Sequence, residues 1–181
     1  MNLPNKLTLF RVILIPFFVF FYISPFFPEY GNYIALVIFI VASLTDLLDG
    51  KIARKYNLVT NFGKFMDPLA DKLLVCSAMV CMVGNGSLES WILIVIICRE
   101  FFISGFRLIA AENGIVIAAS YWGKFKTVFQ MTMVILILLN LQMAWFATLT
   151  VIVKYIAVVL TIVSLCDYVW KNRSVLKETN T

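Results

Sequence analysis

The sequence predicts an all-α membrane protein folded as a bundle of six transmembrane helices. Of the 181 residues, 62% are hydrophobic and only 14% are charged, where a soluble domain carries roughly a quarter charged residues. Several apolar runs exceed the roughly 18 residues that indicate a transmembrane helix. Because only short polar breaks separate these runs, we expect a single membrane-embedded domain over residues 1–181.

Six apolar segments account for the predicted helices, and turn-forming residues account for the breaks between them. The helices are predicted at residues 8–23, 33–55, 67–83, 90–111, 119–140 and 146–170. Residues 24–32 contain two prolines and a glycine, which end the first helix. Residues 57–64 are polar and include a glycine, and residues 84–89 begin Gly-Asn-Gly-Ser, so both segments favour turns over continued helix.

Basic residues gather on one side of the predicted bundle. With six spans, both termini and the loops after the second and fourth helices share a side. That side carries Lys6, Arg11, Lys51, Arg54, Lys55, Lys64, Lys72, Arg107, Lys124, Lys126, Lys171, Arg173 and Lys177. The opposite loops contain Glu29 and Glu89 and no lysine or arginine. The positive-inside rule therefore predicts a protein of the cytoplasmic membrane with both termini in the cytoplasm, and the net charge of +5 gives no reason to propose nucleic acid as a partner.

The residue types available limit the chemistry. The chain has no histidine, the side chain most often used for proton transfer near neutral pH, so acid or base chemistry must use carboxylates, lysine or tyrosine. The four cysteines lie in apolar stretches without a Cys-x-x-Cys pair, which indicates packing residues.

Four aspartates lie where the second predicted helix ends and the third begins. Asp46 and Asp49 are three residues apart, and Asp67 and Asp71 are four apart, so each pair shares one helix face. Four carboxylates gathered near a membrane surface are costly unless cations balance their charge, since a buried ion without a partner costs several kcal/mol. An oxygen-only ligand set suits Mg²⁺ or Mn²⁺, and two such ions, roughly 3.5–4 Å apart, would clamp a phosphoryl-type displacement.

Simpler explanations exist for single residues of this segment. Helix capping could explain Asp67, and ion pairs with Arg54 or Lys72 could explain one or two other aspartates. Neither explains four aspartates at these spacings. The small residues of the segment, two glycines and an alanine, would let helix backbones and a flat ligand approach closely, although any one of them could be only a helix-end or packing residue.

The pattern of this segment resembles a known family. The string Asp46-x-x-Asp49-Gly50-x-x-Ala53-Arg54, eight residues, Gly63-x-x-x-Asp67-x-x-x-Asp71 is similar at every fixed position to the signature of the CDP-alcohol phosphatidyltransferases, six-helix proteins that carry it on helices two and three. Three further strings resemble the branch of that family that uses glycerol 3-phosphate: Pro4-Asn5-x-Leu7-Thr8-x-x-Arg11, Arg99-Glu100-x(6)-Arg107 and Gly123-Lys124-x-Lys126-Thr127. The resemblance covers nearly the whole chain and implies transfer of a phosphatidyl group from CDP-diacylglycerol to glycerol 3-phosphate, with loss of CMP, in phospholipid biosynthesis.

The resemblance also implies a role for each motif residue. The metal ligands would be Asp46, Asp49, Asp67 and Asp71, which together hold two Mg²⁺ or Mn²⁺ ions, and Asp71 would also be the general base for the acceptor hydroxyl. The CDP-diacylglycerol site would comprise Gly50, Ala53, Arg54 and Gly63, with Asn5, Thr8 and Arg11 reaching the same phosphates. The family resemblance further implies a homodimer surrounded by membrane lipids.

Basic residues further along the chain are candidates for binding the acceptor phosphate. Arg99 and Glu100 lie within an apolar helix, where ionisable residues usually face a cavity or one another. Arg107 lies about two turns beyond Arg99, and Lys124 and Lys126 begin the fifth predicted helix. Together the four cations could hold a phosphomonoester. Membrane anchoring could instead explain the lysines, and a pair between Arg99 and Glu100 is disfavoured because helix neighbours diverge by roughly 100°.

Two other functions remain open at this point. The same chemistry could use another acceptor, such as inositol phosphate, serine or a phosphatidyl group, although a basic cluster has little purpose for serine. A small cation transporter would place its carboxylates near the membrane midplane with access from both sides, whereas these aspartates are predicted close to one surface. Lys154 and Asp167 in the sixth predicted helix receive no role.

Overall fold

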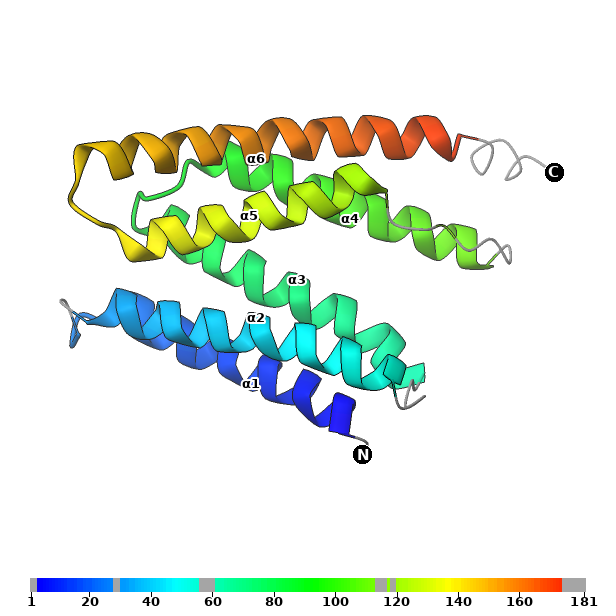
Figure 1. The fold of residues 1–181 in the computed structure, drawn as a ribbon, viewed down its shortest axis with the longest axis horizontal. Helices are drawn as coiled ribbons and strands as arrows, with labels where there is room; N and C mark the ends of the chain where they lie inside the picture. The colour runs from blue at the N-terminus through cyan, green and yellow to red at the C-terminus, as the bar shows by residue number, and fades with distance from the viewer. Residues whose placement is uncertain (1–2, 28–29, 56–60, 113–116, 118–119, 174–181) are drawn as a thin grey trace. The chain divides into compact units, whose positions relative to one another are not determined.

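The computed structural model is helical through most of the chain (Figure 1). It describes residues 3–27, 30–55, 61–112, 117 and 120–173, and among these it leaves the side chains of residues 3–4, 47–55, 61–65, 67–68 and 112 outside the description. The helices are α1 Leu3–Ile23, α2 Gly31–Lys55, α3 Asn61–Gly84, α4 Ser90–Glu112, α5 Tyr121–Leu139 and α6 Ala144–Lys171. In the described ranges there is no strand, so the all-α prediction is confirmed.

The observed helix ends lie within two residues of the predicted ones, with two exceptions. The first helix begins at Leu3 and not near Thr8, and the third begins at Asn61 and not at Asp67. The polar composition around Gly63 predicted a turn, and this prediction is wrong from Asn61 onward. The first N–H groups of a helix have no intrahelical partner, so polar residues that favour turns also suit a first helical turn.

Two compact units make up the chain. The first comprises residues 1–88 and 137–140, and the second comprises residues 89–136 and 141–181. The expectation of a single domain over the whole chain stays a prediction.

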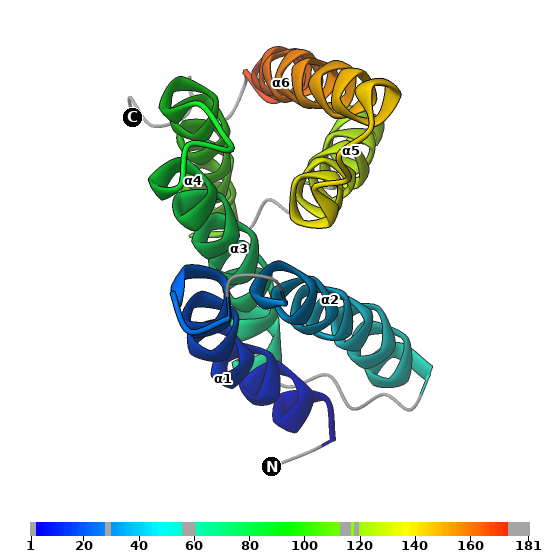
Figure 2. The ribbon, with the colours of Figure 1, turned by 90° about the vertical axis from the view of Figure 1, so that its left-hand side faces the viewer.

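In the first unit, α1 packs against both α2 and α3 (Figure 2). Phe18 of α1 is fully buried and faces Phe39 of α2, with ring centroids 6.3 Å apart. Gly31 lets α2 start close to α1, because a Cβ at this position would lie 2.6 Å from the carbonyl oxygen of Phe21. The two helices therefore form a tight antiparallel hairpin, which brings the first turns of α1 beside the last turns of α2.

In the second unit, α4 packs along α6. Near their C-terminal ends, Ile103, Phe106 and Tyr168 form a buried apolar cluster, in which the Phe106 and Tyr168 rings meet edge to face at 5.7 Å. At the N-terminal end of α4, Lys154 Nζ of α6 donates to both carboxylate oxygens of Glu89, the residue before α4, at 2.6 and 2.7 Å. Contacts at both ends of α4 therefore hold α4 and α6 in one parallel register.

Within the described residues, three helical segments are long and apolar enough to cross a membrane. These are Asn5–Ile23, Tyr121–Leu139 and Ala144–Lys171, and Gly31–Asp46 is a shorter apolar helical stretch. Large apolar side chains face outward along the helices, for example Phe101 at 71% and Val159 at 58% exposure, as contact with lipid requires. The chain is therefore a membrane protein. That every one of the six helices spans the bilayer stays a prediction.

Candidate functional site

The aspartates of the motif lie on the end of α2 and the beginning of α3 in the first unit. The side chains of Asp46 and Asp71 are described and are partly exposed. Asp49 and Asp67 belong to the same two helices, but their side chains lie outside the described part, as do those of Ala53 and Arg54. Gly50 lies in α2 and Gly63 in α3, also among the residues whose surroundings are not described.

Arg11 of α1 contacts the first aspartate of the motif directly. Its guanidinium NH1 lies 2.7 Å from Asp46 Oδ1, and the Arg11 side chain is completely buried while that of Asp46 is 33% exposed. This contact was not foreseen, because the sequence pattern assigned Arg11 to the phosphates of CDP-diacylglycerol. The ion pair joins two helices, and no periodicity within one helix encodes such a contact.

Arg11 is one of three buried polar residues on α1. Asn5 is 8% exposed, Thr8 is 1% exposed, and both share with Arg11 the three-residue spacing that keeps side chains on one helix face. Leu9, Phe10 and other residues on the opposite face are exposed and apolar. The polar stripe of α1 therefore faces the interior of the first unit, as a role in binding a polar group requires.

The described carboxylates fit the metal chemistry predicted for this segment. Asp46 and Asp71 offer only oxygen donors, which Mg²⁺ and Mn²⁺ prefer. Among the side chains that the structure describes, no group of three or more histidine, cysteine, aspartate or glutamate residues gathers, and two of the four predicted ligands are outside that set.

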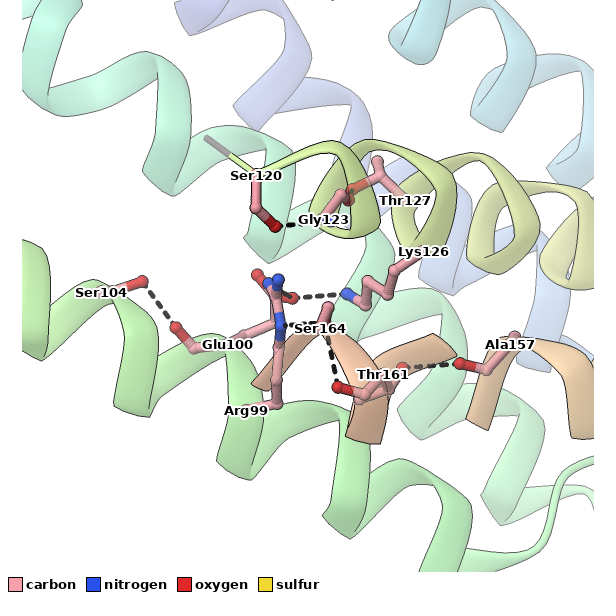
Figure 3. A network of polar contacts seen from close by, with 10 residues as sticks. All are labelled: Arg99, Glu100, Ser104, Ser120, Gly123, Lys126, Thr127, Ala157, Thr161 and Ser164. Carbon is pink, nitrogen blue, oxygen red and sulfur yellow. Dashed lines mark hydrogen bonds and ion pairs between the residues drawn. The ribbon is translucent and has the colours of Figure 1, made fainter. Parts of the chain in front are cut away.

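In the second unit, α4, α5 and α6 meet at a buried ion cluster (Figure 3). Glu100 Oε1 accepts a hydrogen bond from Arg99 NH1 at 2.8 Å and a second, short one from Lys126 Nζ. The side chains of Arg99, Glu100 and Lys126 are 10%, 13% and 3% exposed. The prediction that Arg99 and Glu100 pair poorly as neighbours is wrong, because both side chains are long enough to bend toward Lys126.

Ser164 of α6 fixes the other side of the arginine. Arg99 Nε donates to Ser164 Oγ at 3.1 Å, and Ser164 Oγ itself donates to the carbonyl of Thr161 at 2.9 Å. Because the Ser164 hydroxyl donates its proton to the Thr161 carbonyl, a lone pair of Oγ remains to accept a hydrogen bond from the Arg99 guanidinium. Ser164 was missed, since a single serine in an apolar helix carries no signal beyond packing.

Gly123 of α5 lies against the same guanidinium. A Cβ at Gly123 would be 3.3 Å from Arg99 NH2, tighter than most real contacts. The hydroxyl of Ser120 accepts from the Gly123 backbone N–H at 3.2 Å, and Thr127 Oγ1 donates to the Gly123 carbonyl at 3.0 Å. The first turn of α5 is thus held where it leaves room for the edge of Arg99.

The four predicted acceptor residues divide into two groups. Arg99 and Lys126 are buried together on Glu100. Lys124 is exposed with its Nζ 5.4 Å from the centroid of the Tyr121 ring, and Arg107 is exposed with its Cζ 5.8 Å from that of Tyr168. The structure therefore brings Arg99 and Lys126 together. That Lys124 and Arg107 also bind the acceptor stays a prediction.

The ion cluster carries an excess of positive charge. Counted over these three side chains alone, Arg99 and Lys126 contribute two positive charges and Glu100 one negative charge, which leaves one positive charge on largely buried groups. A cation in poorly hydrated surroundings attracts an anion strongly, and a guanidinium and an ammonium are the groups that proteins use for phosphate. The arrangement can therefore bind a phosphate group.

Comparison with known proteins identifies the family. The family model named CDP-alcohol phosphatidyltransferase matches residues 1–163. A Bacillus subtilis protein named CDP-diacylglycerol–glycerol-3-phosphate 3-phosphatidyltransferase is 43% identical over 99% of both chains. Proteins of the same name from Haemophilus influenzae and Rickettsia typhi are 43% and 36% identical, each over 92% of this chain and over 91% and 94% of their own. This chain therefore belongs to the CDP-alcohol phosphatidyltransferase family.

Proposed function

We propose that this chain transfers a phosphatidyl group from CDP-diacylglycerol to sn-glycerol 3-phosphate, giving phosphatidylglycerophosphate and CMP. The observation that carries the proposal is the similarity, over 99% of both chains, to a relative named for this reaction. The buried cluster of Arg99 and Lys126 supports an acceptor that carries a phosphate. Such a reaction would supply the precursor of an anionic membrane lipid.

Asp71 is the proposed general base. An acceptor hydroxyl oxygen forms a bond to the phosphorus that carries the diacylglycerol, while the bond from that phosphorus to the oxygen of CMP breaks. The hydroxyl proton goes to the Asp71 carboxylate, which is partly exposed on α3. In a chain without histidine, a carboxylate is a reasonable base for this step.

The proposed metal ligands are Asp46, Asp49, Asp67 and Asp71, holding two Mg²⁺ or Mn²⁺ ions. When bound, such ions supply positive charge against the diphosphate and the departing CMP. Arg11 is proposed to hold the Asp46 carboxylate in place from its buried position on α1. The Arg11 ion pair thereby keeps one carboxylate oriented whether or not a cation is present.

The donor and acceptor are assigned to different residues. For CDP-diacylglycerol, the proposed contacts are Gly50, Ala53, Arg54 and Gly63, with Asn5 and Thr8 from the polar stripe of α1 and Arg11 through Asp46. For glycerol 3-phosphate, the proposed contacts are Arg99 and Lys126, while the exposed Lys124 and Arg107 add attraction for an anion arriving from water. Serine or another uncharged alcohol would gain little from these cations.

Orientation and assembly complete the proposal. The positive-inside pattern supports a cytoplasmic location for both termini and for the basic side of the bundle, in the cytoplasmic membrane. A homodimer surrounded by membrane lipids is proposed from the family resemblance. Chemical cross-linking in membranes, followed by sizing in detergent, tests the dimer directly.

CMP release by purified protein in detergent is the direct test of the reaction. The assay supplies CDP-diacylglycerol and Mg²⁺ and compares glycerol 3-phosphate, inositol phosphate, serine and no acceptor. Release should require glycerol 3-phosphate and should fall by at least about a hundredfold in Asp71→Asn, in line with loss of a general base. Asp167→Asn is the matched control, since Asp167 pairs only with the exposed Lys171 at 2.7 Å among the described residues and should leave release unchanged.

Each other outcome of this assay has a defined meaning. Release that depends on a different acceptor would overturn the substrate while keeping the reaction class. No release with any acceptor, despite folded protein with bound metal, would count against an enzyme and favour a cation transporter.

A further inference from the structure

We propose that Glu100 is the positioning residue of the acceptor site. It holds Arg99 and Lys126 together so that both can bind the same phosphomonoester. The proposal rests on the function proposed above and assigns a role to a carboxylate that the reaction itself does not use. An acidic residue inside an anion site needs an explanation, because its charge opposes that of the ligand.

The carboxylate of Glu100 joins the two cations through one atom. Oε1 accepts from both Arg99 NH1 and Lys126 Nζ, so the guanidinium and the ammonium lie on either side of the same oxygen (Figure 3). Two cations this close repel each other strongly where water is scarce. Glu100 therefore makes the close approach of Arg99 and Lys126 possible.

The rest of the arginine is fixed in a way that leaves one edge for a ligand. Arg99 Nε donates to Ser164 and Arg99 NH1 donates to Glu100, while NH2 lies beside Gly123. Within the described residues NH2 has no hydrogen-bond acceptor. A guanidinium held at two of its three nitrogens keeps its plane, and the third nitrogen then points in a defined direction.

The charge balance selects the kind of acceptor. With Glu100 in place the side chains of Arg99, Lys126 and Glu100 together carry one net positive charge, which favours a phosphomonoester over a neutral or zwitterionic alcohol. Without Glu100 the two cations would move apart, and the ligand would meet two separate charges in place of one preorganised pair. Glu100 thus lowers the total positive charge but improves the geometry of the cations for one phosphate.

A purely structural role for Glu100 is the competing explanation, and the chain offers a matched control for it. Glu89 also pairs with a buried lysine of the second unit, Lys154, at 2.6 Å, but it precedes α4, whereas Arg99 lies near the middle of that helix. Glu89→Gln and Glu100→Gln therefore each remove one negative charge from a pair with a buried lysine, although the Glu89 side chain is 42% exposed and that of Glu100 13%. Only Glu100 contacts residues proposed to bind the acceptor.

The test measures steady-state CMP release for the wild type, Glu100→Gln, Glu100→Asp and Glu89→Gln. We expect Glu100→Gln to raise the KM for glycerol 3-phosphate about tenfold or more, the size expected for losing a charged hydrogen bond, with the KM for CDP-diacylglycerol unchanged. Glu100→Asp keeps the charge but is one methylene shorter, so its KM should rise less. Glu89→Gln should leave both KM values unchanged.

The outcomes separate failure of this proposal from failure of the proposed function. If wild-type protein releases CMP only with glycerol 3-phosphate, but Glu100→Gln keeps its KM for that acceptor, Glu100 is merely structural and the proposal is wrong. Should Glu100→Gln fail to fold, an unchanged KM in Glu100→Asp leads to the same conclusion. No acceptor-dependent release by the wild type would overturn the proposed function first and this proposal with it.

Discussion

The two units of this chain each contain a buried arginine bound to a carboxylate, but the pairs differ in which partner is left accessible. In the first unit Arg11 is fully buried and Asp46 keeps 33% of its side-chain surface exposed. In the second unit Arg99 and Glu100 are similarly buried, at 10% and 13%, and Lys126 adds a second cation. The first pair therefore presents a carboxylate, and the second presents positive charge.

This difference suits the two partners proposed for them. A carboxylate oriented by a buried arginine can bind a metal cation, while cations held by a buried glutamate can bind a phosphate. The same interaction between an arginine and a carboxylate thus prepares one site for a cation and the other for an anion. Additional charges determine which ion each site attracts. These are the other aspartates of the motif in the first unit and Lys126 in the second.

Among the substitutions that test this difference, Asp46→Asn should cause the largest loss of stability. Losing one member of a buried ion pair costs about 3–5 kcal/mol, and the partial exposure of Asp46 places the expected loss at the lower end of that range. Arg11→Met should destabilise less, because Asp46 is exposed enough to regain water. Thermal unfolding in detergent measures both. Equal losses, or a larger loss for Arg11→Met, would show that the two partners do not differ in this way.

Ser164→Ala tests whether the arginine of the second unit must be held from both sides. It removes the acceptor of Arg99 Nε at a position with no exposure, and a hydrogen bond to a charged group contributes about 1.5–3 kcal/mol. We expect the KM for glycerol 3-phosphate to rise about tenfold. Thr150→Val, on the same helix, removes only a bond to the Phe146 carbonyl and should leave that KM unchanged; a similar rise in both variants would point to a general effect on α6.

Gly123→Ala should give a smaller change at the same arginine. The added methyl would lie 3.3 Å from Arg99 NH2, so the guanidinium must shift by a few tenths of an ångström, and the KM for glycerol 3-phosphate should rise a few-fold. Gly105→Ala on α4 is the control, since no atom lies within 4 Å of its added Cβ, and it should stabilise the helix by about 0.5–1 kcal/mol. An unchanged KM in Gly123→Ala would mean that NH2 does not face the acceptor.

Much of the fold follows from the sequence, because apolar runs of this length leave few alternatives to membrane helices. The predicted starts of α1 and α3 are wrong. For α3 the reason is that polar residues around Gly63 suit a turn and a first helical turn equally. Arg99 and Lys126 were found as site candidates because a cation inside an apolar helix is costly and so informative. The contact of Glu100 with Lys126 and that of Arg11 with Asp46 depend on packing between helices, which local patterns do not encode.

A third ion pair, between Glu89 and Lys154, sharpens the comparison because it has no proposed ligand. Glu89 precedes α4, and the hydrogen bond from Lys154 holds the pKa of its carboxyl below the ordinary value for glutamate, against the opposing effect of burial. A carboxyl with a lowered pKa stabilises the fold at pH values above about 4.3, the unfolded value. That contribution is lost as the pH falls through the lower folded value.

The pair should therefore give the smallest effect, confined to acid. Glu89 is 42% exposed, so solvent screens the interaction and the loss of stability should be slight. Wild-type protein should melt slightly above Glu89→Gln at neutral pH. The difference should shrink as the pH falls below about 4.3, where the unfolded chain's carboxyl becomes protonated, and should vanish once the folded carboxyl is protonated as well. The KM for glycerol 3-phosphate should stay the same in both. A pH-independent difference in melting temperature would mean that the charge of Glu89 contributes nothing to stability. A changed KM would mean that any lysine–glutamate pair of the second unit affects acceptor binding, and the Glu89 and Glu100 pairs would then not differ in function.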